Sequence, residues 1–417
     1  VIAECKKDMS TAVPMNRLIQ GDVGSGKTAV AAACMYIAAR SGFQSAIMAP
    51  TEVLAAQHAA TLERMLAPFG IKVGLLTGSM KQSEKNAVKL ALKSGEISVL
   101  AGTHAIIQED VEFAKLGLIV TDEQHRFGVR QRLALSQKGG APHTIVMSAT
   151  PIPRTLAFVI YGDLDISILD EMPKNRLGVK TYLVGQDMEQ RVFAFVRRFA
   201  KQGLQSYIVC PLVENEEDGL PLEAAADLAK RIAEKELSDC RIGLLHGRMR
   251  PAEKEQVMRA FAENEIQVLV STTVIEVGVD VPNAVCMVIE NAERFGLSQL
   301  HQLRGRVGRG TEQSYCVLIA GKTSPETKRR LEVVAKTSDG FRVAEEDLKL
   351  RGPGDFFGFR QSGVPMLKMA DMMSDVALLE SAKNAAAELL ESDPTLEKPE
   401  NAALSVRLEK MMSEAAL

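Results

Sequence analysis

The stretch from Gly21 to Thr28 constrains the fold of this chain more than any other part of it. It reads Gly-Asp-Val-Gly-Ser-Gly-Lys-Thr, which fits the phosphate-binding loop pattern. Glycines let consecutive backbone N–H groups converge on phosphate oxygens, Lys27 adds a positive charge, and the Thr28 hydroxyl can coordinate Mg²⁺. The positions expected to bind the phosphates of ATP are Gly21, Gly24, Ser25, Gly26, Lys27 and Thr28.

The flanks of this loop agree with the motif. Residues 17–20 form a short apolar run typical of a buried strand, and residues 29–40 are rich in alanine without glycine or proline, which predicts a helix. Such a helix directs the positive end of its dipole at the phosphates.

Composition excludes several classes of protein. The 417 residues predict two to four domains, and 50 basic against 53 acidic residues give no overall basic charge, which argues against non-specific coating of nucleic acid but permits a local basic groove. The six cysteines form no Cys-x-x-Cys pair and indicate reduced thiols in a cytosolic protein. No apolar run reaches the roughly 18 residues of a membrane span. The chain starts at Val1 without an initiator methionine, so we expect a piece of a longer protein.

Apolar runs alternate with helical stretches through the first half, which predicts a parallel sheet with helices on both faces. The helix after the second run is expected over residues 52–69. Further strands are expected over residues 45–49, 73–77, 97–101, 116–120 and 144–147.

Two adjacent carboxylates, Asp122 and Glu123, follow the run at residues 116–120. In open α/β sheets ligands bind at the carboxyl ends of strands, where the phosphate loop also lies. We therefore expect Asp122 to hold Mg²⁺ and Glu123 to polarise the attacking water.

The alternation resumes after a linker expected at residues 171–177. No second phosphate loop occurs there, so this part should not bind a nucleotide by itself. The expected strands are residues 206–209, 241–245 and 267–270, and the expected helices are residues 222–237 and 251–262.

Taken together, these motifs occur in the order found in superfamily 2 helicases, which the chain resembles. The segments on which this resemblance rests are Gly21–Thr28, Pro50–Glu52, Gly102–His104, Asp122–His125, Ser148–Thr150, Ser271–Asp280 and Gln302–Arg309. The resemblance implies nucleotide contacts from Gly278 and Asp280 and arginines on the γ-phosphate from Arg306 and Arg309, which share one face if their segment is helical. It implies DNA phosphate contacts near Thr51, Thr103 and Thr272.

The C-terminal part resembles the translocation (TRG) motif shared by RecG-type branched-DNA helicases and transcription-repair coupling factors. The matching segments are Asp339–Asp355 and Gly358–Gly363. By this resemblance Arg330 lies on a helical hairpin and Gln361 on the following loop, both coupling motor movement to duplex DNA. Ser25 and the Asp-Glu-Gln-His sequence favour the RecG-type family. Two helices broken at Pro394 and Pro399 are expected beyond it.

The resemblance implies two tandem RecA-like α/β domains and a small helical segment. The expected boundaries are residues 1–175, 176–328 and 329–417. The implied activity is ATP-dependent movement on double-stranded and branched DNA, at stalled forks and Holliday junctions, by a monomer in the bacterial cytoplasm at the nucleoid. Single-stranded DNA-binding protein is a candidate partner, and no membrane is involved. RecG-type enzymes also carry an N-terminal wedge domain, which nothing in this sequence supplies.

Two alternatives remain at this point. One is a double-stranded DNA translocase of the transcription-repair coupling type. The other is a nucleotide-switch adaptor with little turnover, against which the presence of Lys27, Asp122, Glu123, Arg306 and Arg309 argues.

Overall fold

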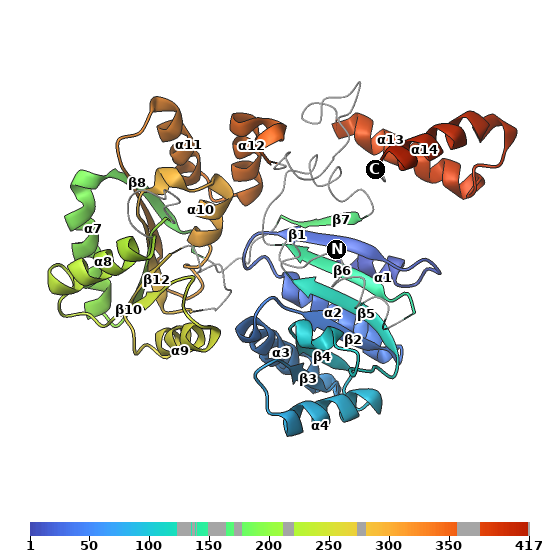
Figure 1. Cartoon of the computed structure of the whole chain (residues 1–417), viewed down its shortest axis with the longest axis horizontal. Coiled ribbons are helices and arrows are strands. Elements are labelled where there is room, and N and C mark those ends of the chain that lie inside the picture. The colour runs from blue at the N-terminus through green and yellow to red at the C-terminus, as the bar shows by residue number, and fades with distance from the viewer. Residues whose placement is uncertain are drawn as a thin grey trace. The chain divides into compact units, whose positions relative to one another are not determined.

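The chain folds into two compact units in the computed structural model, residues 1–151 with 163–344 and residues 152–162 with 345–417. The structure describes residues 1–122, 135, 138, 140–148, 164–170, 177–211, 221–272, 281–356 and 376–415. The first unit contains two parallel sheets, and the described residues of the second are helices and their connections (Figure 1).

All strands of the first sheet run parallel, in the order β3-β4-β2-β5-β6-β1-β7. The strands are β1 (Asn16–Gly21), β2 (Gln44–Met48), β3 (Val73–Leu76), β4 (Val99–Gly102), β5 (Leu116–Asp122), β6 (His143–Ser148) and β7 (Asp165–Leu169). The helices between them are α1 (Ile2–Asp8), α2 (Lys27–Arg40), α3 (Glu52–Leu66) and α4 (Gln82–Lys93), with short 3₁₀ turns η1 (Ala67–Phe69) and η2 (His104–Ile107).

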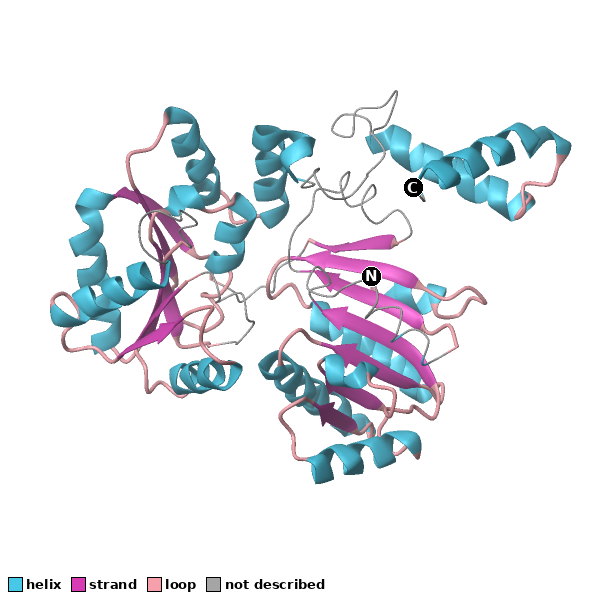
Figure 2. Ribbon diagram, viewed as in Figure 1, coloured by secondary structure: helices cyan, strands magenta, loops and turns pink. Residues whose placement is uncertain are grey.

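Side chains of one strand enter two different cores, because successive residues point to opposite faces. Ile47 of β2 packs with residues of α1, α2 and α3, whereas its neighbours Ala46 and Met48 pack with Leu92 of α4. Figure 2 shows helices on both sides of the strands. Burial on both faces explains why these strands read as continuous apolar runs.

The second sheet is also parallel, in the order β10-β11-β9-β12-β13-β8. Its strands are β8 (Lys180–Gly185), β9 (Gln205–Val209), β10 (Ile242–Leu245), β11 (Val268–Ser271), β12 (Ala284–Ile289) and β13 (Tyr315–Ala320). The helices are α7 (Glu189–Lys201), α8 (Pro221–Glu234), α9 (Pro251–Ala262), α10 (Leu297–Arg304), α11 (Pro325–Lys336) and α12 (Gly340–Phe356), with η5 (Gln186–Met188) and η7 (Ala292–Arg294). Val334 of α11 and Val343 of α12 share a core with Leu300 of α10.

The two sheets repeat one plan, since β3-β4-β2-β5-β6-β1 corresponds strand by strand to β10-β11-β9-β12-β13-β8. The loop after the first edge strand repeats as well: Gly-Leu-Leu-x-Gly-x-Met occupies residues 74–80 and 243–249. In the first copy the Thr77 amide donates to Met80 Sδ at 3.3 Å, and in the second the His246 amide donates to Met249 Sδ at 3.4 Å.

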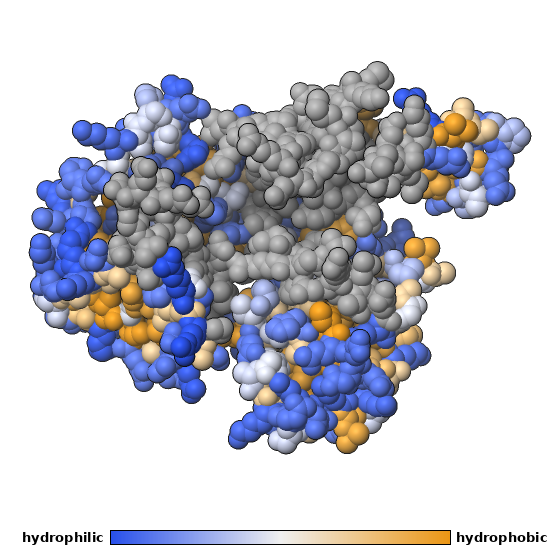
Figure 3. All heavy atoms as spheres, in the orientation of Figure 1, coloured by the Kyte–Doolittle hydropathy of each residue, from blue (hydrophilic) through white to orange (hydrophobic). Residues whose placement is uncertain are grey.

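The second unit holds α13 (Val376–Ser392), η8 (Pro399–Asn401) and α14 (Ala402–Ala415). Asp393 fixes the turn between them, accepting hydrogen bonds from the amides of Glu397 and Lys398 and from Asn401 Nδ2 at 3.1, 3.0 and 2.7 Å. Both helices expose apolar side chains such as Leu378 and Val406, and Figure 3 shows apolar and polar atoms mixed on their surface.

The predicted fold class is confirmed: two RecA-like parallel sheets are followed by a helical segment. Six elements were not expected from the sequence, namely β7, β8, β12, β13, α4 and α7. Most of the expected linker, residues 171–176, lies outside the described residues, and the boundaries at residues 175 and 328 stay predictions. All six cysteines are free. In the part of the chain that the structure describes, no helix is both long and apolar enough to cross a membrane.

One buried amide in each sheet fixes the connection from a helix to the next strand. Gln44 Nε2 donates to the carbonyls of Leu92 and Ile97, both at 2.8 Å, and its Oε1 accepts from the Lys115 amide at 2.9 Å. Gln205 at the start of β9 donates in the same way to the carbonyls of Phe261 and Ile266.

Replacing Gln44→Leu should therefore destabilise the first sheet by about 3 kcal/mol, because the carbonyls of Leu92 and Ile97 and the amide of Lys115 each lose a hydrogen bond. Urea unfolding combined with hydrogen exchange of β4 amides measures this loss. Gln82→Leu, an exposed position on α4, is the matched control and should change stability by less than about 0.5 kcal/mol. If Gln44→Leu and Gln82→Leu lowered the free energy of unfolding equally, the role of Gln44 in fixing this connection would be contradicted.

Candidate nucleotide-binding site

The phosphate loop connects β1 to α2, and its residues Gly24 and Gly26 are exposed. Gly24 and Gly26 have φ of 82° and 95°, a conformation that favours glycine. A Cβ built on Gly26 would meet no atom within 4 Å. The helix begins at Lys27, two residues earlier than expected, and Gly26 gives it no side-chain cap. The first-turn N–H groups and the positive end of α2 thus lie beside Gly26, where the backbone leaves room for a bound group.

The start of the loop is held together by Lys27. Its Nζ donates to the carbonyls of Gly21 and Asp22 at 2.7 and 2.8 Å. Gly21 is required sterically, since a Cβ there would lie 2.5 Å from Ser25 Oγ and 2.9 Å from Leu169 Cβ.

Asp122 ends β5 at the same edge of the sheet and is oriented by a histidine from α3. His58 Nε2 lies 2.9 Å from Asp122 Oδ2, and the two side chains are 10% and 15% exposed. Glu123 lies outside the described residues. Among the described residues no group of three metal-binding side chains is close enough to hold an ion.

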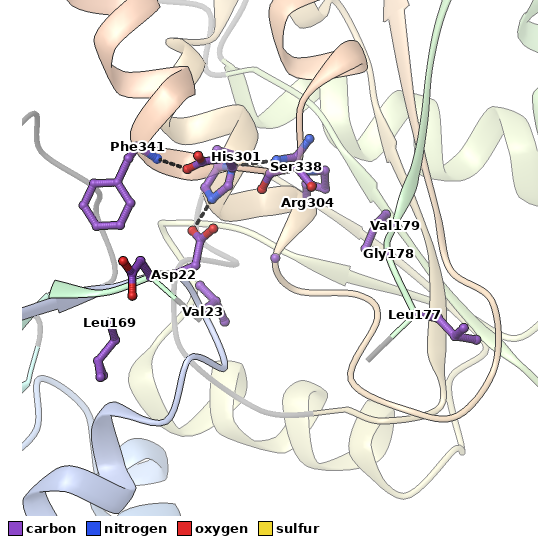
Figure 4. A pocket seen from close by; sticks show the side chains of 13 residues that line it. Asp22, Val23, Leu169, Leu177, Gly178, Val179, His301, Arg304, Ser338 and Phe341 are labelled. Atoms are coloured by element: carbon purple, nitrogen blue, oxygen red, sulfur yellow. Dashed lines mark hydrogen bonds and ion pairs between the residues drawn. The ribbon is translucent and has the colours of Figure 1, made fainter. Parts of the chain in front are cut away.

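The loop also meets the second sheet's helices through Asp22. Its carboxylate contacts His301 Nε2 of α10 (Figure 4). It also accepts a hydrogen bond from the Gly340 amide at 3.3 Å. Burial alone would raise the pKa of Asp22, but the hydrogen bonds from His301 and Gly340 and the nearby Arg304 charge hold that pKa below its ordinary value. Around this contact lies a cavity of about 430 Å³ that Asp22 and Val23 border and Lys27 does not.

The expected arginine pair does not lie on a helix. α10 ends at Arg304, and the following turn contains Gly308 with φ of 79°, so Arg306 and Arg309 do not share a helix face. Gly305 leads into this turn and packs against Val23 of the phosphate loop, where a Cβ on Gly305 would be 3.2 Å from Val23 Cβ. The arginines therefore follow a segment that touches the loop, and their role stays a prediction.

The threonines predicted near DNA follow strands: Thr103 and Thr272 come directly after β4 and β11, and Thr51 lies three residues beyond β2. Thr51 caps α3, accepting from the Leu54 amide at 3.4 Å. Thr103 and Thr272 are buried. Their backbone amides donate to the carbonyls of Leu76 and Leu245, respectively. Their hydroxyls are enclosed and have no hydrogen-bond partner among the described residues. These two residues anchor their loops and offer neither group to a ligand in this structure.

The remaining predicted residues divide into one that the structure places and three that it does not describe. Arg330 lies on α11, and its Nη2 donates to the carbonyls of Glu293 and Phe295 at 2.7 and 3.3 Å. Gly278, Asp280 and Gln361 lie outside the described residues.

A second cavity, of about 480 Å³, opens at the carboxyl ends of β9 and β12. Glu290 borders it, is 8% exposed, and has an Oε1 atom without a hydrogen-bond partner among the described residues. Burial and the carboxylate of Glu189 raise the pKa of Glu290 to about 7, and Arg231, which is paired with Glu189, acts in the opposite direction.

Sequence reasoning missed Asp22, His58, His301 and Glu290. His58 and His301 each meet an aspartate far away in the sequence, which no local pattern reveals. Glu290 directly follows the apolar run of β12, so a carboxylate at a strand's carboxyl end was a usable signal.

Three family models match consecutive parts of the chain. They are the DEAD/DEAH box helicase model over residues 4–159, the helicase conserved C-terminal domain over residues 171–311, and the domain 3 C-terminal part of ATP-dependent DNA helicase RecG over residues 337–416.

Curated relatives and solved structures agree with these matches. The chain is 52% identical to ATP-dependent DNA helicase RecG of Bacillus subtilis (strain 168), covering 98% of this chain and 60% of that protein. With the Thermotoga maritima protein of the same name the identity is 50%, covering 91% and 49%. The structure of RecG bound to a three-way DNA junction matches at 47% identity and a TM-score of 0.77, over 91% of this chain and 49% of that one. Yeast Dbp5, at 16% identity and a TM-score of 0.57, shares the fold. The chain thus spans about half to three-fifths of the length of these RecG relatives.

The His58–Asp122 contact predicts an effect on divalent-cation binding. His58→Ala should weaken Mn²⁺ binding in the presence of ADP at least about ten-fold, because partners of metal ligands set their orientation. His58→Gln, which can still donate to Asp122, should stay within a few-fold of the parent. Electron paramagnetic resonance of Mn²⁺ measures both, with the exposed His104→Ala as control. Parental Mn²⁺ affinity in the alanine variant would remove His58 from this role.

Glu290 predicts a pH-dependent stability. Its folded-state pKa of about 7 exceeds the ordinary 4.5, so between these values the folded chain binds a proton that the unfolded chain has released, and stability falls as the pH rises. The cost above pH 7 is about 3 kcal/mol, at about 1.4 kcal/mol per pKa unit.

Glu290→Gln should therefore stabilise the second sheet at pH 8 and have little effect near pH 4.5. Urea unfolding at both pH values tests this, with the exposed Glu234→Gln as control. A gain that is the same at both pH values would show that the carboxyl does not titrate as described.

Proposed function

Because this chain belongs to the RecG family of ATP-dependent DNA helicases, we propose that it is the motor of an enzyme that hydrolyses ATP to move on double-stranded and branched DNA. Stalled forks and Holliday junctions are the proposed substrates, in recombination and repair. A related RecG was solved on a three-way DNA junction, which supports branched DNA as the substrate class.

The observation that carries the proposal is the open phosphate loop. Gly26 has left-handed backbone geometry, free space beside its Cα and an uncapped helix behind it. These features suit an anion that accepts hydrogen bonds from successive amides. Lys27 and Asp122 supply the cation and the carboxylate that nucleoside triphosphate chemistry needs at the same edge.

The roles of the individual residues follow from this arrangement. The loop from Gly21 to Thr28 holds the phosphates, and Thr28 and Asp122 hold Mg²⁺. Bound Mg²⁺ neutralises phosphate charge during transfer. Glu123 accepts a proton from the attacking water, and Arg306 and Arg309 stabilise charge that develops on the phosphate. Gly278 and Asp280 complete the nucleotide contacts.

DNA contacts are proposed at the loops that start from Thr51, Thr103 and Thr272. Since the amides and hydroxyls of Thr103 and Thr272 are engaged or enclosed, residues beside them meet the DNA phosphates. Such contacts fix position without reading sequence. Arg330 and Gln361 belong to a proposed TRG hairpin and loop that transmit motor movement to duplex DNA.

The proposed domains are a first lobe over residues 1–175, a second over residues 176–328, and a TRG and C-terminal segment over residues 329–417. The proposed setting is the bacterial cytoplasm at the nucleoid. The enzyme is proposed to act as a monomer, with single-stranded DNA-binding protein as a partner.

Steady-state ATP hydrolysis by the 417-residue chain tests the proposal. The rate should rise when linear or forked duplex DNA is added. Glu123→Gln should lower turnover at least about 100-fold while ADP still binds, the scale of losing a general base. Glu109→Gln, an exposed carboxyl in the loop before β5, is the control and should keep the parental rate.

Two results would overturn the assignment. ATP binding without hydrolysis under any DNA condition would make the chain a nucleotide switch. Turnover by Glu123→Gln within a few-fold of the parent would place the general base elsewhere.

A further inference from the structure

Asp22 lies within the phosphate loop, at a position that the motif leaves open, and its side chain contacts α10 and the start of α12. Its carboxylate lies 13% exposed and contacts His301, which is 5% exposed, and the backbone amide of Gly340. Gly340 begins α12. One carboxylate therefore joins the loop to two elements that are far away in the sequence.

The position of the proton on His301 follows from its other neighbour. Arg304 Nη2 lies 2.7 Å from His301 Nδ1, and a guanidinium can only donate. His301 Nδ1 thus accepts, and Nε2 carries the hydrogen that is donated to Asp22. The direction of each hydrogen bond is fixed by the arginine.

Arg304 itself is hydrogen-bonded to the segment that connects α11 to α12, called here the α11–α12 turn. It is 4% exposed, and its guanidinium donates to the carbonyls of Val334, Thr337 and Ser338 at 2.7, 2.6 and 3.2 Å. Arg304 thus donates both to this turn and to His301, and His301 donates in its turn to Asp22, so the contacts are continuous from the turn to the loop. Figure 4 shows Asp22, His301, Arg304 and Ser338 of this chain. The Gly340 amide closes the chain into a ring.

The same loop segment is fixed from its other side. The Asp22 carbonyl accepts from Lys27, and Val23 packs against Gly305. The shape of the loop before it meets a phosphate therefore depends on groups outside the first sheet. A site that is already ordered loses less conformational entropy when its ligand binds.

We propose that Asp22 and His301 are positioning residues that keep the phosphate loop in its binding shape and thereby link nucleotide occupancy to the stability of the α11–α12 turn. This rests on the proposed function in that the loop binds a nucleotide. Coupling between two sites is reciprocal: if the turn strengthens nucleotide binding, nucleotide binding stabilises the turn by the same factor.

The test uses the 417-residue chain without DNA and the fluorescent nucleotide mant-ADP. Asp22→Ala and His301→Leu should each weaken mant-ADP binding at least about five-fold, the lower end of typical coupling between sites. The double variant should be no weaker than the single ones, because both belong to one chain of bonds. His301→Gln supplies one donor and one acceptor in place of the imidazole and should stay within about two-fold of the parent.

Hydrogen exchange of residues 337–341 gives a readout that a loss of packing alone would not reproduce. ADP should slow exchange there at least about five-fold in the parent and in His301→Gln, and should leave it unchanged in His301→Leu. Lys328→Ala, an exposed change on α11, controls for general effects on the hairpin and should behave as the parent. Far-UV circular dichroism verifies that each variant is folded.

The outcomes separate this inference from the proposed function. The inference alone is overturned if His301→Leu binds mant-ADP as tightly as the parent does. It is also overturned if ADP does not change the hydrogen-exchange rate of residues 337–341 in the parent. Failure of the parent to bind mant-ADP overturns the nucleotide role of the loop, and this inference with it.

Discussion

The parallel direction of every strand that the structure describes is the constraint on which the rest of the molecule depends. Parallel strands place all their carboxyl ends at one edge of the sheet, so the phosphate loop after β1, the cap at Thr51 after β2 and Asp122 at the end of β5 gather there without further design. The helices needed to connect parallel strands cover both faces and bury the strands. One topological choice therefore supplies both the core and the position of the candidate site.

The sequence was sufficient for the fold class and for the loops at this edge, because strands buried on both faces leave continuous apolar runs next to recognisable motifs. The edge strands β7 and β8 escaped prediction because they are only partly buried and their patterns, Asp165–Leu169 and Lys180–Gly185, mix polar with apolar residues. β12 and β13 do contain apolar runs, so both strands could have been predicted from the sequence. A shared face for Arg306 and Arg309 was expected only if their segment was helical, and that condition is not met, because α10 ends at Arg304 and the backbone turns left-handed at Gly308.

The side-chain network of the site could not be read from the sequence. Tertiary packing brings together two pairs, Asp122 with His58 and Asp22 with His301. A single histidine in a helical sequence does not reveal which residue it will contact. What decides their roles is geometry: Arg304 beside His301 fixes which ring nitrogen donates, and this requires the position of a third residue. Motifs thus located the phosphate loop, and packing supplied the residues that hold it.

The repeated plan of the two sheets bears on the origin of the chain. Six strands correspond in order, and the loops at residues 74–80 and 243–249 share their sequence pattern. Gln44 and Gln205 each donate to one carbonyl at the end of a helix and to one just before the next strand. Duplication of a single ancestral six-stranded unit is sufficient to generate both halves. After such an event only one copy had to retain the phosphate loop, and the corresponding segment after β8 was left to diverge. Glu290, which follows β12, then stands at the strand end that corresponds to Asp122 at the end of β5.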